Sequence, residues 1–171
     1  MRPGAAALVA GLRAQGIGMQ VLSGDNRAVV AALAARLGIG DWQAECLPAG
    51  KVAAIEALRL GGHRVLMVGD GLNDTGALAA ADVSISPASA LDAARVASDI
   101  VLLGQDLAPI ADALRIARLA RRRIKQNFAT SAADNLVAVP LALVGMATPL
   151  AAALAMSLSS ITVSLNALKM R

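Results

Sequence analysis

Acidic and polar residues gather where one apolar run ends. The run at 65–68 is typical of a buried parallel strand. Glycine, aspartate and asparagine follow it, as Gly69, Asp70, Gly71, Asn73 and Asp74. Two carboxylates near a strand end suit a hard cation such as Mg²⁺, which takes oxygen ligands and accompanies phosphates. The glycines let the backbone turn sharply and approach a phosphoryl group. The stretch therefore predicts Mg²⁺-dependent phosphoryl chemistry.

Two other segments could belong to the same site. Ser23, Gly24 and Asp25 end the expected strand 17–22, where a hydroxyl and backbone N–H groups can hold phosphate oxygens. Lys51 lies in the first turn of a helical pattern and can neutralise a transferring phosphoryl group. Alone, a Ser-Gly-Asp is usually a turn and a helix-start lysine is usually solvated. All three segments follow parallel strands, however, so we expect them at one edge of a sheet.

Helical and strand patterns alternate along the first 104 residues. This order predicts an α/β domain with a parallel sheet and helices on both faces. The expected helices are 5–15, 27–37, 49–60 and 89–97, and the expected strands are 17–22, 44–47, 64–68, 83–85 and 100–103.

The composition changes after residue 104. Residues 1–112 carry 8 bases and 11 acids, whereas residues 113–171 carry 8 bases and 1 acid. We expect a basic linker helix over 105–126, centred on 107–125. A membrane part over 127–171 follows, with spans at about 128–147 and 150–168, each close to the roughly 20 residues that cross a bilayer. Bases lie at both outer ends, including Lys169 and Arg171, which predicts cytoplasmic ends and a multi-pass protein of the inner membrane.

Two other interpretations of this second half were weighed. A buried helical hairpin of a soluble protein would also be apolar, but two adjacent spans of membrane length with this charge pattern favour the bilayer. The basic cluster at 115–125 could contact nucleic acid. Its place directly before an apolar span, without interleaved aromatic residues, favours lipid headgroups instead. We therefore expect membrane lipid and no nucleic acid as a partner.

Several motifs support a family resemblance over nearly the whole chain. LSGDNR (22–27), LPAGK (47–51) and MVGDGLNDTGALAAADVSIS (67–86) resemble the phosphorylation domain of P-type ATPases, a branch of the haloacid dehalogenase (HAD) superfamily. QNFATSAADN (126–135) and AMSLSSITVSLNALK (155–169) resemble the last two membrane helices of the heavy-metal-transporting class. The closest resemblance is to copper(I) exporters that serve cytochrome oxidase assembly.

The resemblance implies a role for each motif residue. Asp70 and Asp74 would hold Mg²⁺, with Asn73 shaping that site. Lys51 and Ser23 would stabilise the phosphoryl group delivered by ATP in the complete pump, and Asp25 would orient its loop. The backbone of Gly24, Gly69 and Gly71 would lie against phosphate. Asn135, Met156 and Ser160 would bind the transported copper(I) or a similar ion, for which a thioether is a suitable soft ligand.

The family's phosphorylated aspartate, in an Asp-Lys-Thr-Gly-Thr sequence, does not occur here. We therefore expect the chain to be a C-terminal piece of a longer pump. Its sheet would lack the central strand. The piece would need the N-terminal part of the pump as a partner and would be inactive alone. Two departures from the family pattern are Thr75-Gly76, expected to loosen the following helix, and Asp134 in place of a tyrosine. The alternatives are a membrane-anchored HAD-type phosphatase and a non-catalytic metal-binding hairpin that complements a separate chain.

Overall fold

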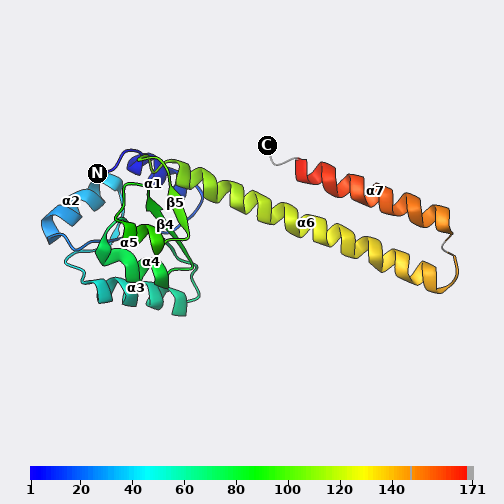
Figure 1. The fold of residues 1–171 in the computed structure, drawn as a ribbon, viewed down its shortest axis with the longest axis horizontal. Coiled ribbons are helices and arrows are strands. Elements are labelled where there is room, and N and C mark those ends of the chain that lie inside the picture. Colours follow the sequence, from blue (N-terminus) through cyan, green and yellow to red (C-terminus); the bar gives the residue numbers. More distant parts are fainter. Residues whose placement is uncertain (147, 169–171) are drawn as a thin grey trace. The chain divides into compact units, whose positions relative to one another are not determined.

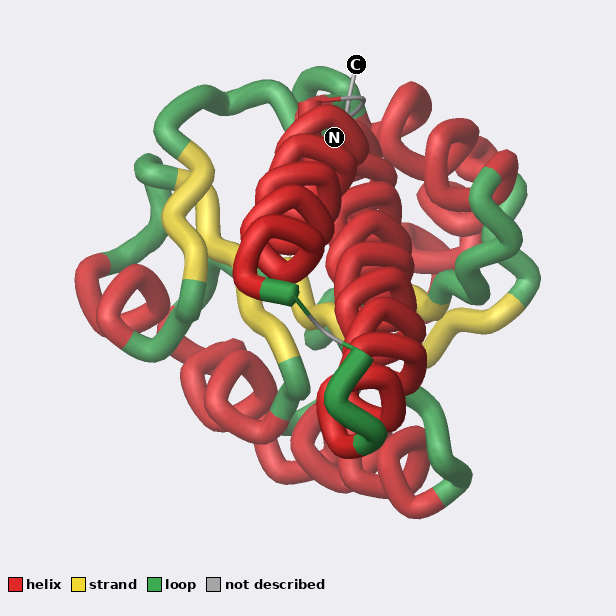
Figure 2. The backbone as a smooth tube through the Cα atoms, turned by 90° about the vertical axis from the view of Figure 1, so that its right-hand side faces the viewer, coloured by secondary structure: helices red, strands yellow, loops and turns green. Residues whose placement is uncertain are grey.

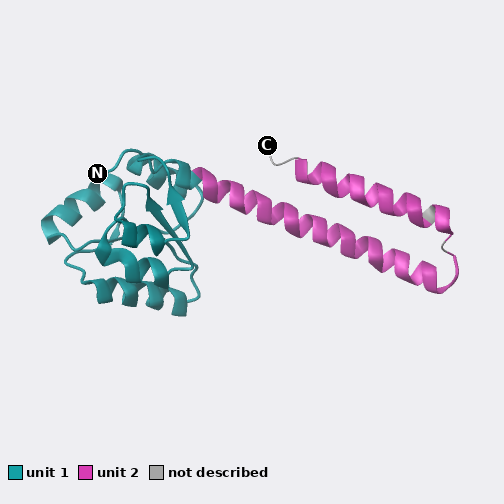
Figure 3. Ribbon diagram, in the orientation of Figure 1, with its two compact units in different colours: residues 1–111 teal, residues 112–171 magenta. Residues whose placement is uncertain are grey.

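The computed structural model describes residues 1–146 and 148–168, which fall in two compact units. The first unit comprises Met1–Ala111 and the second Asp112–Arg171 (Figure 3). The expected basic residues Lys169 and Arg171, and the end of the first expected span at residue 147, lie outside the described residues.

Helices and short strands alternate along the first unit, so the predicted α/β class is confirmed (Figure 1). The helices are α1 (Ala5–Ala14), α2 (Arg27–Leu37), α3 (Pro48–Leu60), the 3₁₀ turn η1 (Leu72–Asp74), α4 (Thr75–Ala80) and α5 (Asp92–Val96). The strands are β1 (Gln20–Leu22), β2 (Asp41–Gln43), β3 (Leu66–Val68), β4 (Val83–Pro87) and β5 (Ile100–Leu102).

All strand pairing in the described residues is parallel, in two separate sheets. One sheet pairs β1 with β2, with Val21 opposite Trp42. The other has the order β3-β4-β5, with Met67 opposite Ser84. Within the described residues no ladder joins β1 to β3. The parallel sheet was expected, and its division between β1 and β3 lies where the resemblance implied a missing strand.

The strand expected at 44–47 is wrong, because the chain pairs three residues earlier, as β2. Glu45 has a φ of 55°, a left-handed conformation that ends an extended strand. Its N–H donates to the carbonyl of Asp25 at 2.9 Å, and that of Cys46 donates to the carbonyl of Ser23 at 2.9 Å. The segment therefore braces the loop after β1 instead of extending the ladder.

Local residue chemistry sets the ends of the first unit's helices. Asn26 accepts the N–H of Val29 at 3.0 Å and so caps α2, which ends where Gly38 takes a φ of 65°. Pro48 begins α3, where its missing N–H leaves no bond unmade. The core packs Leu78 of α4 with Ala90 and Ala94, and Met67 and Ala97 lie against this cluster.

The second unit is a pair of helices, α6 (Pro109–Leu143) and α7 (Pro149–Leu168), which lie side by side in Figures 1 and 2. The sequence had suggested a linker helix that ends near residue 125, but α6 continues without a break for 35 residues. Gly145, with a φ of 74°, lies in the connection that follows. None of the described helices is both long enough and apolar enough to cross a membrane. The two expected spans are therefore not confirmed.

Candidate functional site

Lys51 and Asp74 form an ion pair inside the first unit. Lys51 Nζ donates to Asp74 Oδ1 at 2.6 Å, and both side chains are largely shielded from solvent, with exposed fractions of 9% and 13%. Lys51 comes from the first turns of α3 and Asp74 from the end of η1, which follows β3. The structure thus brings together two of the residues that the sequence singled out.

The glycines beside this pair give Asp74 its place. The N–H of Gly71 donates to Asp74 Oδ2 at 3.2 Å, so both oxygens of the carboxylate have a partner. A Cβ on Gly69 would lie 2.9 Å from the Cβ of Asp74, a distance that no real side chain keeps. Gly69 is therefore required by close approach of the backbone to Asp74.

Asp70, at the end of β3, is half-exposed and has a different partner. Its Oδ2 accepts two bonds from Arg2, from Nη2 at 2.5 Å and from Nε at 3.2 Å. A further nitrogen of Arg2 donates to Ser89 Oγ at 3.0 Å. The sequence analysis missed Arg2 and Ser89, because no pattern links residues separated by 68 and 87 positions.

Ser23 and Asp25 form a local turn after β1. Ser23 Oγ donates to Asp25 Oδ2 at 3.1 Å and accepts the N–H of Asp25 at 3.2 Å. Gly24, Asp25 and Asn73 are exposed. In the described part of the chain, no hydrogen bond or ion pair joins Ser23, Gly24, Asp25 or Asn73 to the Lys51–Asp74 pair. The structure therefore assembles only part of the expected site by direct contact.

The donor chemistry around Asp70 fits Mg²⁺ better than it fits a transition metal. Among the described residues no group of three or more histidine, cysteine, aspartate or glutamate side chains gathers for a metal. Mg²⁺ keeps several waters and is commonly held by one or two carboxylates plus phosphate oxygens. Asp70 offers such a carboxylate at the protein surface, whereas Asp74 is engaged by Lys51 and Gly71.

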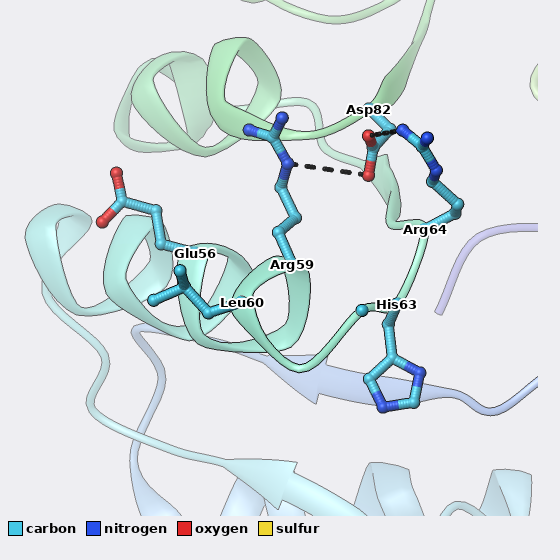
Figure 4. A pocket seen from close by; sticks show the side chains of 7 residues that line it. Glu56, Arg59, Leu60, His63, Arg64 and Asp82 are labelled. Atoms are coloured by element: carbon cyan, nitrogen blue, oxygen red, sulfur yellow. Dashed lines mark hydrogen bonds and ion pairs between the residues drawn. The ribbon is translucent and has the colours of Figure 1, made fainter.

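A second charged cluster lies at the amino ends of β3 and β4, the ends away from Asp70. Asp82 accepts the N–H of Val65 at 2.9 Å and a bond from Arg64 at 2.8 Å, and Arg59 lies 3.7 Å away (Figure 4). The Val65 hydrogen bond and then Arg64 hold the pKa of Asp82 below its ordinary value. The arginines flank a shallow hollow lined also by Glu56, Leu60, Gly62 and His63. Asp82 therefore pairs with both arginines at this end of the sheet.

Ser84 and Asp99 clamp β4 to the start of β5. Asp99 Oδ2 accepts both the N–H and the hydroxyl of Ser84 at 2.8 Å, and the N–H of Asp99 returns a bond to Ser84 Oγ at 3.0 Å. These bonds, the Ser84 hydroxyl first, lower the pKa of Asp99. Sequence reasoning missed this clamp because Ser84 looked like one position of an alternating strand.

Five polar residues of the second unit form hydrogen bonds between its two helices. Asp134 Oδ2 accepts the hydroxyl of Ser159 at 2.5 Å. Asn166 accepts from Arg123 at 2.9 Å and donates to Asn127 at 2.7 Å. We call these five residues the polar seam. Their outward-facing neighbours are largely apolar, among them Leu136, Val137, Leu154, Leu158, Ile161 and Leu165.

The three residues expected to bind the transported ion do not lie in the polar seam. Asn135, Met156 and Ser160 are exposed, Met156 to 73%. Ser159, one position before Ser160, faces the other helix instead. Among the described residues, none of the hydrogen bonds between α6 and α7 involves these three side chains.

Comparison with known proteins gives matches over the whole chain. A family model described as haloacid dehalogenase-like hydrolase matches residues 1–82. The nitrogen fixation protein FixI of Bradyrhizobium diazoefficiens is 49% identical over 171 residues, which is all of this chain and 23% of that protein. A copper-exporting P-type ATPase of Bacillus subtilis is 40% identical over 95% of this chain and 20% of its own length.

Solved structures agree with these matches. A zinc-transporting PIB-type ATPase in its E2.Pi state has a TM-score of 0.90 and 32% identity, covering 99% of this chain and 28% of that one. The catalytic domain of the CPx-ATPase CopB-B has a TM-score of 0.62 and 35% identity over 65% of this chain. The chain therefore spans less than a quarter of the length of the curated relatives it matches.

Proposed function

The chain belongs to the cation-transporting P-type ATPases, and on that basis we propose that it is part of an ATP-driven pump for a heavy-metal cation. Copper(I) is the ion we favour, because a copper exporter is among the relatives and Met156 offers a soft ligand. The observation that carries the proposal is the buried Lys51–Asp74 pair beside Asp70, at the carboxyl end of β3.

In the proposed pump these residues act on a phosphoryl group. Asp74 holds the Lys51 ammonium in place, and Lys51 balances negative charge on the phosphoryl oxygens. Ser23 and the N–H of Gly24 bind the same oxygens from the loop after β1. Asp70 takes Mg²⁺, and when bound this ion neutralises phosphate charge and orients the group. The acceptor carboxylate comes from a segment outside this sequence.

The division of the sheet supports that assignment. β1 and β3 each end at a loop that carries proposed site residues, yet no ladder joins these two strands in the described residues. A strand supplied by the rest of the pump would pair with both and present its own carboxylate between Asp25 and Asp70. Such pairing would satisfy backbone groups along both strands.

We place the α6–α7 hairpin in the membrane part of the pump, with the first unit on the cytoplasmic side. Polar side chains face one another between the helices, and large apolar side chains face outward. In water the reverse order is favoured, whereas in lipid or against other apolar helices buried polar groups join helices together. Asn135, Met156 and Ser160, exposed on this hairpin, would then meet the ion together with ligands from other helices of the pump.

A chimeric pump tests the proposal. The 171 residues replace the aligned part of a copper-exporting relative, and ATP-dependent phosphorylation is measured in membranes with copper(I), zinc(II) and no metal. We expect a metal-dependent, acid-stable phosphoprotein, lost in Lys51→Ala and kept in Arg13→Ala. A chimera that folds and inserts but forms no phosphoprotein with either ion would contradict the proposal. Hydrolysis of p-nitrophenyl phosphate by the chain alone would favour the phosphatase alternative instead.

A further inference from the structure

Arg2 occupies one of the two carboxylate oxygens of Asp70. Two nitrogens of its guanidinium, Nε and Nη2, converge on Asp70 Oδ2. The third, Nη1, donates to Ser89 Oγ at 3.0 Å. All three guanidinium nitrogens are thus engaged, and the side chain is only one-third exposed. A guanidinium with two side-chain partners is more restricted than one that makes a single surface ion pair.

The backbone on both sides holds this contact in place. The carbonyl of Pro3 accepts the N–H of Leu107 at 3.1 Å, which ties the segment that carries Arg2 to the loop after β5. Gly4 has a φ of 72°, and a Cβ there would overlap the side chain of Asp106. The segment therefore enters α1 along a path that only glycine allows.

The backbone around Asp70 and Ser89 is also held by hydrogen bonds. The N–H of Leu91 donates to the carbonyl of Asp70 at 3.3 Å, and Ala90 bonds back to Pro87 at 2.8 Å. Ser89 lies in this same short loop, between β4 and α5. The loop thus fixes Asp70 through its backbone and Arg2 through the Ser89 hydroxyl.

We propose that Arg2 is a latch on Asp70, so that the guanidinium and a divalent cation take the same carboxylate oxygen in alternation. The guanidinium already takes lone pairs of Oδ2, and a cation brought to this oxygen would meet a positive charge beside it, so binding of one displaces the other. The latch keeps the carboxylate neutralised when no phosphate and cation are present. It also makes release of Arg2 part of loading the site. This inference rests on the proposed role of Asp70 as the Mg²⁺ ligand.

The test measures cation binding directly, without turnover. Mn²⁺, which is visible by electron paramagnetic resonance, is titrated into the full chain in detergent, and Mg²⁺ is used as a competitor. We expect Arg2→Ala to bind Mn²⁺ about three- to tenfold more tightly than the parent chain, and Ser89→Ala to show a smaller gain. Arg13→Ala is the matched control, because it removes the same charge and, in the described part of the chain, Arg13 bonds to the carbonyls of Leu37 and Gly38 and not to Asp70.

A second measurement follows the latch itself. The side-chain Nε–H resonance of Arg2 is recorded by ¹⁵N NMR as Mg²⁺ is added. It is expected to shift in step with Mn²⁺-detected binding, because the cation breaks the bond from Nε to Asp70.

The outcomes separate the latch from the function on which it rests. If Asp70→Asn binds cations as the parent does, Asp70 is not the ligand and the proposed magnesium role fails. If Asp70→Asn loses binding but Arg2→Ala gains none over Arg13→Ala, only the latch is wrong. An Arg2 resonance that stays unchanged at saturating Mg²⁺ also overturns the latch. Absence of binding in both the parent and Arg2→Ala overturns both proposals.

Discussion

Lys51 Nζ and Asp74 Oδ1 lie 2.6 Å apart, although 23 residues separate them along the chain. Their pairing joins the start of α3 to the end of η1, and it leaves neither buried charge uncompensated. A buried ion pair of this kind is costly to break from one side, since the remaining charge keeps its desolvation penalty.

Lys51→Ala is therefore expected to lower the free energy of unfolding of the first unit by about 3 kcal/mol. Lys51→Ala/Asp74→Ala should be less destabilised than the sum of the two single variants. Denaturant unfolding followed by circular dichroism measures all three. Arg95→Ala, which removes an exposed partner of Asp92, is the control and should cost less than about 0.5 kcal/mol. Equal losses in Lys51→Ala and Arg95→Ala would contradict a buried pair.

Gly69→Ala tests the close approach of the backbone to Asp74. The added Cβ would lie 2.9 Å from that of Asp74, so the carboxylate must move away from Lys51. We expect a loss of about 1–3 kcal/mol of stability. Gly18→Ala is the matched control, because a Cβ there meets nothing within 4 Å. Unfolding midpoints that agree for the two variants would contradict the packing argument.

The stability of the first unit should fall in acid because of Asp82 and Asp99. Both carboxyls hold a pKa below the ordinary value, through bonds from Val65 and Arg64 and from Ser84 respectively. The unfolded chain therefore takes up protons first, near a pKa of about 3.9. The stabilisation is complete above that pH and is lost as pH falls through the lower pKa of the folded state.

Ser84→Ala separates the contribution of Asp99 from that of Asp82. Without the hydrogen bond from the Ser84 hydroxyl, the pKa of Asp99 should rise toward its ordinary value. The free energy of unfolding should then depend less on pH in acid. Carboxyl ¹³C NMR titration measures the pKa of Asp99 and of Asp82 in the same samples. A titration of Asp99 that Ser84→Ala leaves unchanged would show that the hydroxyl does not set its pKa.

Asn166→Ala should weaken the contact between α6 and α7. The variant removes the acceptor of Arg123 and the donor to Asn127, at an expected cost of about 1–2 kcal/mol in a helix pair in detergent. Titration with a denaturing detergent, followed by circular dichroism, measures the loss. Asn135→Ala is the control, since Asn135 is exposed on the same helix as Asn127. A larger effect from Asn135→Ala would contradict the polar seam.

Met156→Ala tests the assignment of the ion independently of helix packing. In the chimeric pump, copper(I)-dependent phosphorylation should need about tenfold more metal, because a soft thioether ligand is removed. Leu158→Ala, which shortens another exposed side chain on α7, should leave the metal dependence unchanged. Identical copper responses in the two variants would remove Met156 from the ion path.

The sequence predicted the order of helices and strands, because apolar runs, Gly38 and Pro48 give local signals that the structure follows. It also predicted that Lys51 and the motif that holds Asp74 lie at one edge of the sheet, but it did not predict their ion pair. It did not predict the bond from Arg2 to Asp70 or the bond from Ser84 to Asp99. Such contacts depend on how the fold brings together segments that are distant in the sequence. The strand misplaced at 44–47 had the right composition, but its place was decided by the left-handed conformation of Glu45.

In the hairpin, the sequence identified the apolar character of residues 128–147 and 150–168 but not which polar residues would meet. Met156 and Ser160 are four positions apart on α7 and therefore lie on one face of that helix. Asp134, identified as a departure from the family pattern, is one of the residues that bond across the helix pair, in its case to Ser159. The neighbouring helix decides which face is internal, and a single segment carries no signal for that choice.

The separate ladders of β1–β2 and β3–β4–β5 bear on the fate of this chain in a cell. In the described part of the chain, no strand pairs with the outer edge of β1 or of β3, and such edges can pair with an extended peptide, including a second molecule of the same protein. Each strand is only three residues long, which limits growth of such assemblies. In the pump proposed above, a segment that pairs with these edges would protect the chain from chaperones and proteases, and the chain alone would lack that protection. Half-life in cells, with and without the upstream part of the pump, would report that difference.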